Sequence, residues 1–208
     1  MPIAAAVVYS VVIMCQPATI DRFRADLVMI PLRSVGLNSP LAQKAHKWIT
    51  SMTVSDDAEE GQAFWDWIVQ HYNWNVVGAG SLLDSYFFCD VRNSSLLATI
   101  SLVRDDREVG KTYSIPGVWM GGANVRREWR NHGVMAAAFG QLDAYIKTIV
   151  DATGDELTVN MFTGTEIMAK IAVKAGFVFR KTLRVDFFGE DEHWHNKIFS
   201  AAESSNAR

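Results

Sequence analysis

Residues 125–135 of this chain read Val125-Arg126-Arg127-Glu128-Trp129-Arg130-Asn131-His132-Gly133-Val134-Met135, and this stretch decides the fold. It follows an apolar run over 118–125 that predicts a strand, and it precedes 134–150, whose apolar residues recur at helical spacing. A turn between a strand and a helix directs several backbone N–H groups to one place at the positive end of the helix dipole. Such a place binds anions, and Gly133 permits a phosphate to approach closely. On spacing alone, an ordinary solvated basic turn fits the same residues.

The same segment resembles the pyrophosphate loop of the GNAT family of N-acetyltransferases, whose pattern is Arg/Gln-x-x-Gly-x-Gly/Ala. Arg130 and Gly133 fill its first and fourth positions, whereas Met135 replaces the last small residue. Downstream, the run 172–177 (Ala-Val-Lys-Ala-Gly-Phe) resembles the family's helix ending in Lys-Leu-Gly-Phe. The run 194–197 (Trp-His-Asn-Lys) resembles the ending of the RimJ/RimL-like branch, which acetylates ribosomal proteins at their N-termini. The resemblance covers roughly residues 48–200.

The resemblance implies a mixed α/β (α+β) GNAT fold, with a mostly antiparallel central sheet, one splayed strand pair and flanking helices. Residues 1–200 are expected to form a single GNAT domain, in which 1–47 match less clearly, and 201–208 form a polar tail. From the residue patterns, the expected elements are a strand over 3–15, helices over 19–29, 41–49 and after Asp56, strands over 86–91, 96–103 and 118–125, a helix over 134–150, a strand over 157–162, a helix over 165–175, and strands over 177–188 and 194–200.

Composition narrows the class of protein. The chain has 208 residues, 49% of them hydrophobic, and a formal net charge of −3, which favours one packed domain and argues against nucleic acid or an anionic membrane as partner. Cys15 and Cys89 have no zinc-type spacing, so buried free thiols and no metal are expected. The apolar run 3–15 is too short to cross a bilayer and lacks the basic start of a signal peptide. A cytoplasmic location follows as an expectation.

In the family, acetyl-CoA is the co-substrate and lies where two neighbouring strands splay apart. By resemblance these strands end at Val125 and Phe162. The residues implied to hold the pantetheine arm by their main chain are Ala123, Asn124 and Val125. Those implied to hold the pyrophosphate by their amides are Arg130, Asn131, His132, Gly133, Val134 and Met135. Thr165 stands where the family often begins its last helix with Asn.

Transfer of an acetyl group to an amine needs a neutral amine, a polarised carbonyl and a proton for the leaving thiolate. Asn160 is a candidate because it faces the splayed region; it contacts the pantetheine or the amine, or is satisfied locally at its strand end. Tyr113 is the second catalytic candidate, and further candidates are Ser114, Glu128 and His132. The chain departs from the family by carrying Ala172 at the usual acid position and Trp119 at a usual base position.

The sequence therefore predicts an acetyl-CoA-dependent N-acyltransferase that acts by direct transfer on a primary amine, either a protein N-terminus or a small molecule. The missing acid and base favour an alternative, a GNAT-fold protein that binds acyl-CoA as a sensor without transferring it. A third alternative is a GNAT-fold protein that acts on a nucleic-acid acceptor. The excess of acidic over basic residues argues against it. The expected partner is the amine-bearing acceptor. No association with a membrane is expected, and the sequence does not decide between a monomer and a homodimer.

Overall fold

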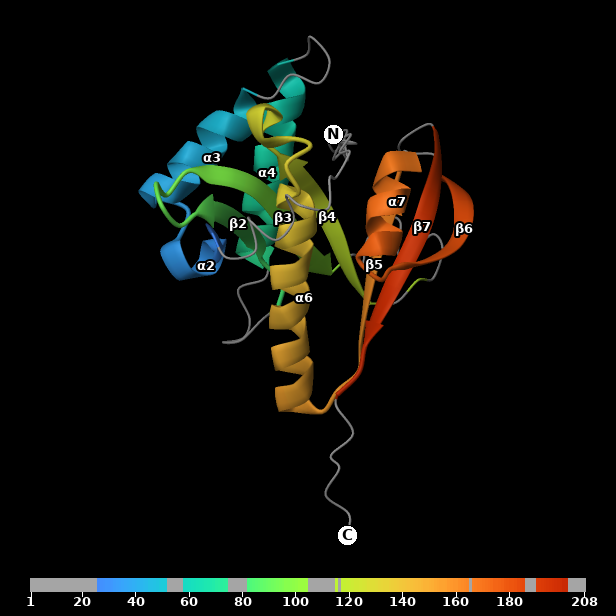
Figure 1. Cartoon of the computed structure of the whole chain (residues 1–208). Helices are drawn as coiled ribbons and strands as arrows, with labels where there is room; N and C mark the ends of the chain where they lie inside the picture. The colour runs from blue at the N-terminus through green and yellow to red at the C-terminus, as the bar shows by residue number, and fades with distance from the viewer. Residues whose placement is uncertain are drawn as a thin grey trace.

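A seven-stranded sheet forms the centre of the molecule in the computed structural model, which describes residues 26–51, 58–74, 82–104, 115, 117–164, 166–185 and 190–201 (Figure 1). Its strand order is β1-β2-β3-β4-β5-β7-β6. The strands are β1 (Leu27–Pro31), β2 (Ser85–Asp90), β3 (Leu96–Arg104), β4 (Val118–Val125), β5 (Leu157–Thr163), β6 (Val178–Val185) and β7 (Glu190–Phe199). All neighbouring strands are antiparallel except β4 and β5, which run parallel.

Helices cover both faces of this sheet. They are α2 (Leu32–Val35), α3 (Pro40–Thr50), α4 (Ala58–Trp74), α6 (Val134–Thr153) and α7 (Glu166–Lys174), with a short 3-10 turn η1 (Arg127–Trp129). Side chains alternate along β2, so Tyr86 and Phe88 pack into the main core with α6, whereas Phe87 and Cys89 pack with α3 and α4 on the other face. Figure 1 shows α6 and α7 in front of the sheet and α3 and α4 behind it.

The parallel strands β4 and β5 stay together for only three residue pairs. The pairs are Val118 with Val159, Trp119 with Asn160 and Met120 with Met161. Beyond them β4 continues to Val125 and β5 to Thr163 without pairing to each other. The splayed strand pair expected for the fold is therefore present, at the predicted strands.

A bulge in β4 accompanies this separation, as the two glycines of the strand predict. The β3–β4 register shifts between Thr99 and Ser101, opposite a segment in which Gly122 has φ +58°. The carbonyl of Gly122 accepts hydrogen bonds from the side chains of Thr99 and Asn124, at 3.2 Å each. Phe64 of α4 lies directly against Gly122, so only a residue without a side chain fits there.

Two sequence predictions differ from the structure. The helix expected over 19–29 is wrong for its described part, because Leu27–Pro31 form strand β1, paired with β2 from Leu27 opposite Asp90. Strand pairing and the burial of Leu27 outweigh the local pattern here. Strand β7 begins at Glu190, four residues before the predicted start, since it pairs there with Val185. The strand predicted over 3–15 and the helix cap at Asp56 lie outside the described residues.

Cys89 is a free, buried thiol, as expected, while Cys15 lies outside the described residues. Burial raises the pKa of the Cys89 thiol to about 11, so it stays protonated and poorly reactive at neutral pH. Among the described helices, none combines the length and apolarity needed to cross a bilayer.

Replacing Gly122 by alanine should destabilise the fold at the bulge. The new methyl group would meet the Phe64 ring and the residue would keep a left-handed φ, so we expect a loss of about 3 kcal/mol in the free energy of unfolding. Gly36→Ala is the matched control, because Gly36 has φ +80° but open space around it, and should lose only about 1 kcal/mol. Urea unfolding measures both, and equal losses would contradict the steric argument.

Candidate functional site

The turn between β4 and α6 reverses the chain through two left-handed residues. After η1, the N–H of Arg130 donates to the carbonyl of Arg127 at 3.3 Å. Asn131 then has φ +65° and Gly133 φ +77°. A left-handed backbone is strained for most side chains, and Asn and Gly tolerate it best. The turn thus keeps a defined shape that leads directly into α6.

The first turn of α6 presents backbone donors that the helix cannot satisfy itself. Gly133 is the N-cap, no side chain caps it, and no acidic residue stands in the first turn. The first helical bond runs from the N–H of Ala137 to the carbonyl of Gly133, at 3.0 Å. The N–H groups of Val134, Met135 and Ala136 precede that bond, so they have no acceptor within the helix. The long helix α6 therefore begins with a donor cluster suited to an anion.

Two arginines fix this turn to its surroundings. The Nε of Arg130 donates to the carbonyl of Val125 at 3.3 Å, which ties the turn to the end of β4. The guanidinium of Arg126 lies over the Trp48 ring, 5.4 Å from its centroid, and its Nη1 is 3.6 Å from a carboxylate oxygen of Glu128. The Nε of Arg126 is buried and has no hydrogen-bond acceptor among the described residues. Both arginine side chains are therefore held by residues within or next to the turn.

The open edge of β4 also offers backbone groups toward β5. The N–H of Arg126 donates to Leu97 of β3 at 2.9 Å. Because backbone groups alternate between the two edges of a strand, those of Ala123 and Val125 face the opposite edge, where β5 has separated. Arg130 occupies the carbonyl of Val125, which leaves the N–H groups of these two residues at the splay. The side chain of Asn124, in contrast, braces the bulge.

An aromatic cluster lies at the same splay on the α4 face of the sheet. We use this name for four rings (Trp67, Trp119, Phe162 and Trp194) and the aliphatic side chains packed with them (Val103, Ile115 and Leu183). The rings of Trp119 and Phe162 bridge β4 and β5, with centroids 4.9 Å apart. The neighbouring Val159 and Met161 point the other way, into the main core under α6. The donor cluster of α6 and the aromatic cluster are thus built around one separation of strands.

Asn160 lies within this arrangement and is fully buried. It pairs with Trp119 across the ladder, and its Oδ1 accepts a hydrogen bond from the Trp194 indole at 3.1 Å. The structure thus places Asn160 at the splay with its carbonyl oxygen held by a neighbouring ring. Ala172 is buried in the main core, so no acid or base stands at that position or at Trp119.

The remaining sequence candidates are dispersed or lie outside the described residues. Tyr113, Ser114 and Thr165 belong to the latter group. His132 is exposed and stands edge-on to Trp129, with centroids 6.1 Å apart, and Glu128 is exposed beside Arg126. Of the predicted set, the end of β4, the turn and the start of α6 follow one another along the chain, and Asn160 lies on β5 opposite Trp119, one pair before the strands separate.

Sequence reasoning missed Glu192, a buried carboxylate on β7. It pairs with Leu183, a member of the aromatic cluster, so its side chain is on the same face of the sheet. Its carboxylate lies against Gly164, just after β5, where an added Cβ would be 3.0 Å from Oε1. The sequence placed residues 189–192 in a turn, and a charged residue in a turn is expected at the surface. Only the strand alternation of Glu192 and Trp194 could have indicated a buried position.

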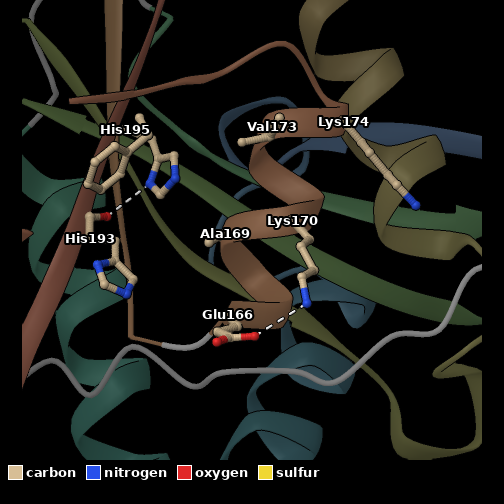
Figure 2. A pocket seen from close by; sticks show the side chains of 8 residues that line it. Glu166, Ala169, Lys170, Val173, Lys174, His193 and His195 are labelled. Carbon is tan, nitrogen blue, oxygen red and sulfur yellow. Dashed lines mark hydrogen bonds and ion pairs between the residues drawn. The ribbon is translucent and has the colours of Figure 1, made fainter. Parts of the chain in front are cut away.

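A cavity of about 490 Å³ opens elsewhere, between α7 and strands β6 and β7 (Figure 2). Its lining residues are Glu166, Ala169, Lys170, Val173, Lys174, Phe179, His193 and His195. No residue of β4 or of the turn contributes, so this cavity is not the predicted CoA cleft. The Nδ1 of His193 bonds Thr182 at 2.9 Å and that of His195 bonds the carbonyl of His193 at 3.0 Å, as expected for strand-face residues. Burial lowers the pKa of His195.

Comparison with known proteins shows which solved structures share this architecture. Neither a protein-family model nor a curated protein sequence matches the chain. Among solved structures, a protein described as a GNAT-family acetyltransferase from Bordetella pertussis superposes with a TM-score of 0.60 at 12% identity, covering 83% of this chain and 95% of that one. The C-terminal condensation domain of Ebony, in complex with β-alanyl-dopamine, superposes with a TM-score of 0.55 at 12% identity, covering 83% of this chain and 98% of that one. A spermidine N-acetyltransferase chimera involving Vibrio cholerae superposes with a TM-score of 0.54 at 13% identity, covering 82% of this chain and 94% of that one.

The predicted fold is therefore confirmed: this chain has the GNAT fold, with a mixed, mostly antiparallel sheet and helices on both faces. At these identities the likeness concerns the fold alone. The activity has to be argued from the site.

The stability of the protein should fall as the pH is lowered from 7 to 5, partly through His195. Because burial lowers its pKa, the unfolded chain takes up a proton near pH 6.5, whereas the folded imidazole takes one up only at a lower pH. Proton uptake then favours unfolding, so stability is lost as the pH falls. Urea unfolding at pH 7, 6 and 5 should give a shallower loss for His195→Gln than for the wild type. Parallel losses would exclude His195 as a source of the pH dependence.

Proposed function

We propose that this protein is an acyl-CoA-dependent N-acyltransferase that transfers an acetyl group from acetyl-CoA to a primary amine. The observation that carries the proposal is the uncapped start of α6, which lies beside two strands of a GNAT fold that separate after three residue pairs. A pyrophosphate and a thioester arm need these two features together: donors for the anion, and open strand edges for the amide groups of the arm.

The residues present fit a bound CoA. The amides from Arg130 to Met135, the left-handed Gly133 above all, would hold the pyrophosphate, with the positive charge of the arginines beside it. The main chain of Ala123, Asn124 and Val125 would follow the pantetheine arm along the open edge of β4. Thr165 remains part of this proposed site.

The proposed chemistry uses positioning more than a dedicated acid and base. Bound acetyl-CoA supplies the thioester, and the N–H of Val125 or Ala123 would polarise its carbonyl. The amine attacks that carbonyl, so a C–N bond forms, the C–S bond breaks and the amine loses a proton. The buried Glu192 is our proposed proton acceptor, Asn160 orients Trp194, and Tyr113 is the proposed proton donor to the thiolate.

The aromatic cluster supports amine attack in a second way. An amine that enters apolar surroundings loses hydration, which penalises its charged form and lowers its pKa. The cluster consists of aromatic and aliphatic side chains around the point where β4 and β5 separate. An acceptor held there would be partly deprotonated by its surroundings, which reduces the demand on a side-chain base.

A CoA-binding sensor without transfer is the second candidate function. It is favoured by Ala172, whose methyl group cannot protonate a thiolate, and by Trp119, whose indole cannot accept a proton from an amine. We further propose a cytoplasmic location and keep the homodimer as a proposal.

Gly133→Asp should weaken CoA binding at least about tenfold, because a carboxylate would stand where the pyrophosphate binds. Gly133→Asn is the matched variant: Asn has the same shape, tolerates the left-handed backbone and carries no charge, so its loss should be clearly smaller. Gly154→Asp, at the other end of α6, controls for general effects of the substitution. Titration calorimetry with CoA measures all three.

Thiol release from acetyl-CoA with a panel of amines and peptides then separates the two candidates. Release that depends on an amine supports transfer, and tight CoA binding without release supports the sensor. Unchanged CoA affinity in Gly133→Asp would remove the basis of both.

A further inference from the structure

Trp119 carries a buried hydrogen-bond donor that the described part of the chain does not satisfy. The side chain is 5% exposed, and its indole Nε1 has no hydrogen-bond acceptor among the described residues. The indole of Trp194, in the same cluster, donates to Asn160. A buried donor left without an acceptor costs about 1–3 kcal/mol, so such a group indicates a partner that arrives with a ligand.

The position of Trp119 relates this donor to the acceptor side of the splay. Trp119 belongs to the second of the three β4–β5 pairs, one pair before the strands separate, and its ring packs on Phe162 of the neighbouring strand. Gly121, two residues further along β4, lies beneath the Trp67 ring of α4, with an added Cβ only 3.4 Å from it. The indole thus stands between α4 and the sheet, on the face opposite α6 and its donor cluster.

We infer that the Trp119 indole N–H binds the carbonyl oxygen of the acceptor, and that the acceptor is an α-amino carbonyl compound such as the N-terminus of a peptide. This inference rests on the proposed function and names its substrate class. An indole N–H only donates, so its partner must bring a lone pair that the reaction does not consume. In an amine acceptor the nitrogen lone pair is used for attack, whereas a neighbouring carbonyl oxygen is free to accept.

A polyamine does not meet this requirement. Its remaining nitrogens are protonated at neutral pH and offer donors only, which leaves the Trp119 donor unpaired. Its additional positive charges would also enter a site whose side chains are aromatic and aliphatic apart from the one carboxylate of Glu192, so more than one charge would lose hydration with a single counter-charge present. A peptide N-terminus carries one amine, one adjacent carbonyl and little further charge. Complementarity to the cluster therefore favours the peptide.

The direct test is the indole signal of Trp119 in protein labelled with ¹⁵N-tryptophan. The signal is identified by its loss in Trp119→Phe, and spectra are recorded with CoA alone, with CoA and tri-alanine amide, and with CoA and spermidine. We expect a downfield shift of the Trp119 indole proton with the tripeptide and none with spermidine. A shift complete with CoA alone, an equal shift with spermidine, or no shift with the tripeptide overturns the inference.

Kinetics provides a second readout. Trp119→Phe should lower kcat/KM about tenfold for tri-alanine amide and less than about twofold for spermidine. Trp65→Phe is the matched control, because Trp65 is similarly buried but stacks on His46 in the α3–α4 core, away from the splay. Equal losses for both amines in Trp119→Phe would mean that the indole serves the thioester and would overturn the inference.

The two proposals fail in different ways. If the wild type does not bind CoA, the proposed function fails, while titration of the tripeptide still tests the Trp119 signal. If CoA binds with unchanged affinity to the wild type and Trp119→Phe but no amine reacts, the transfer activity fails and the indole shift alone decides whether Trp119 recognises a carbonyl.

Discussion

The separation of β4 and β5 is the constraint on which the rest of the site depends. Three residue pairs hold the strands together, and then the bulge at Gly122 and the α4 side chains beneath it direct β4 away. Separated strands inside a sheet leave backbone donors and acceptors without partners, which is costly unless water or a ligand takes them. The fold accepts that cost at one place, between the start of α6 and the aromatic cluster. The same backbone arrangement therefore lies between the uncapped start of α6 on one face and the aromatic cluster on the other.

A partly buried ion pair connects the elements around this separation. Lys197 of β7 donates to a carboxylate oxygen of Asp143 on α6 and to the carbonyl of Ala175 at the end of α7. Burial raises the pKa of Asp143, and the lysine opposes that effect. The same ammonium group thus contacts two helices at once, which fixes the position of both relative to β7. Helices α6 and α7 are thereby connected to one strand.

The two faces of the site divide recognition between backbone and side chains. Around α6 the groups that would bind CoA are main-chain amides, which explains how Met135 can replace a small residue: its side chain packs into the main core. On the α4 face the groups are aromatic rings, the indole donor of Trp119 and the carboxylate of Glu192. With Ala172 and Trp119 at the usual acid and base positions of the family, the proposed transfer would draw more of its rate from desolvation and from alignment of the two substrates.

The sequence by itself determined the elements whose signals are local. The predicted strand 118–125 has the bounds that the structure shows, and the predicted helix from Val134 ends three residues before the observed one. Both predictions succeed because apolar periodicity and glycine positions are properties of the segment itself. What the tertiary structure decided depends on pairing between distant residues. Leu27–Pro31 become a strand only beside β2, and the burial of Glu192 follows from its register with Leu183. The unpaired donor of Trp119 is also a tertiary fact, since a residue's neighbours across a sheet, and hence its missing acceptor, are not written in its own stretch of sequence.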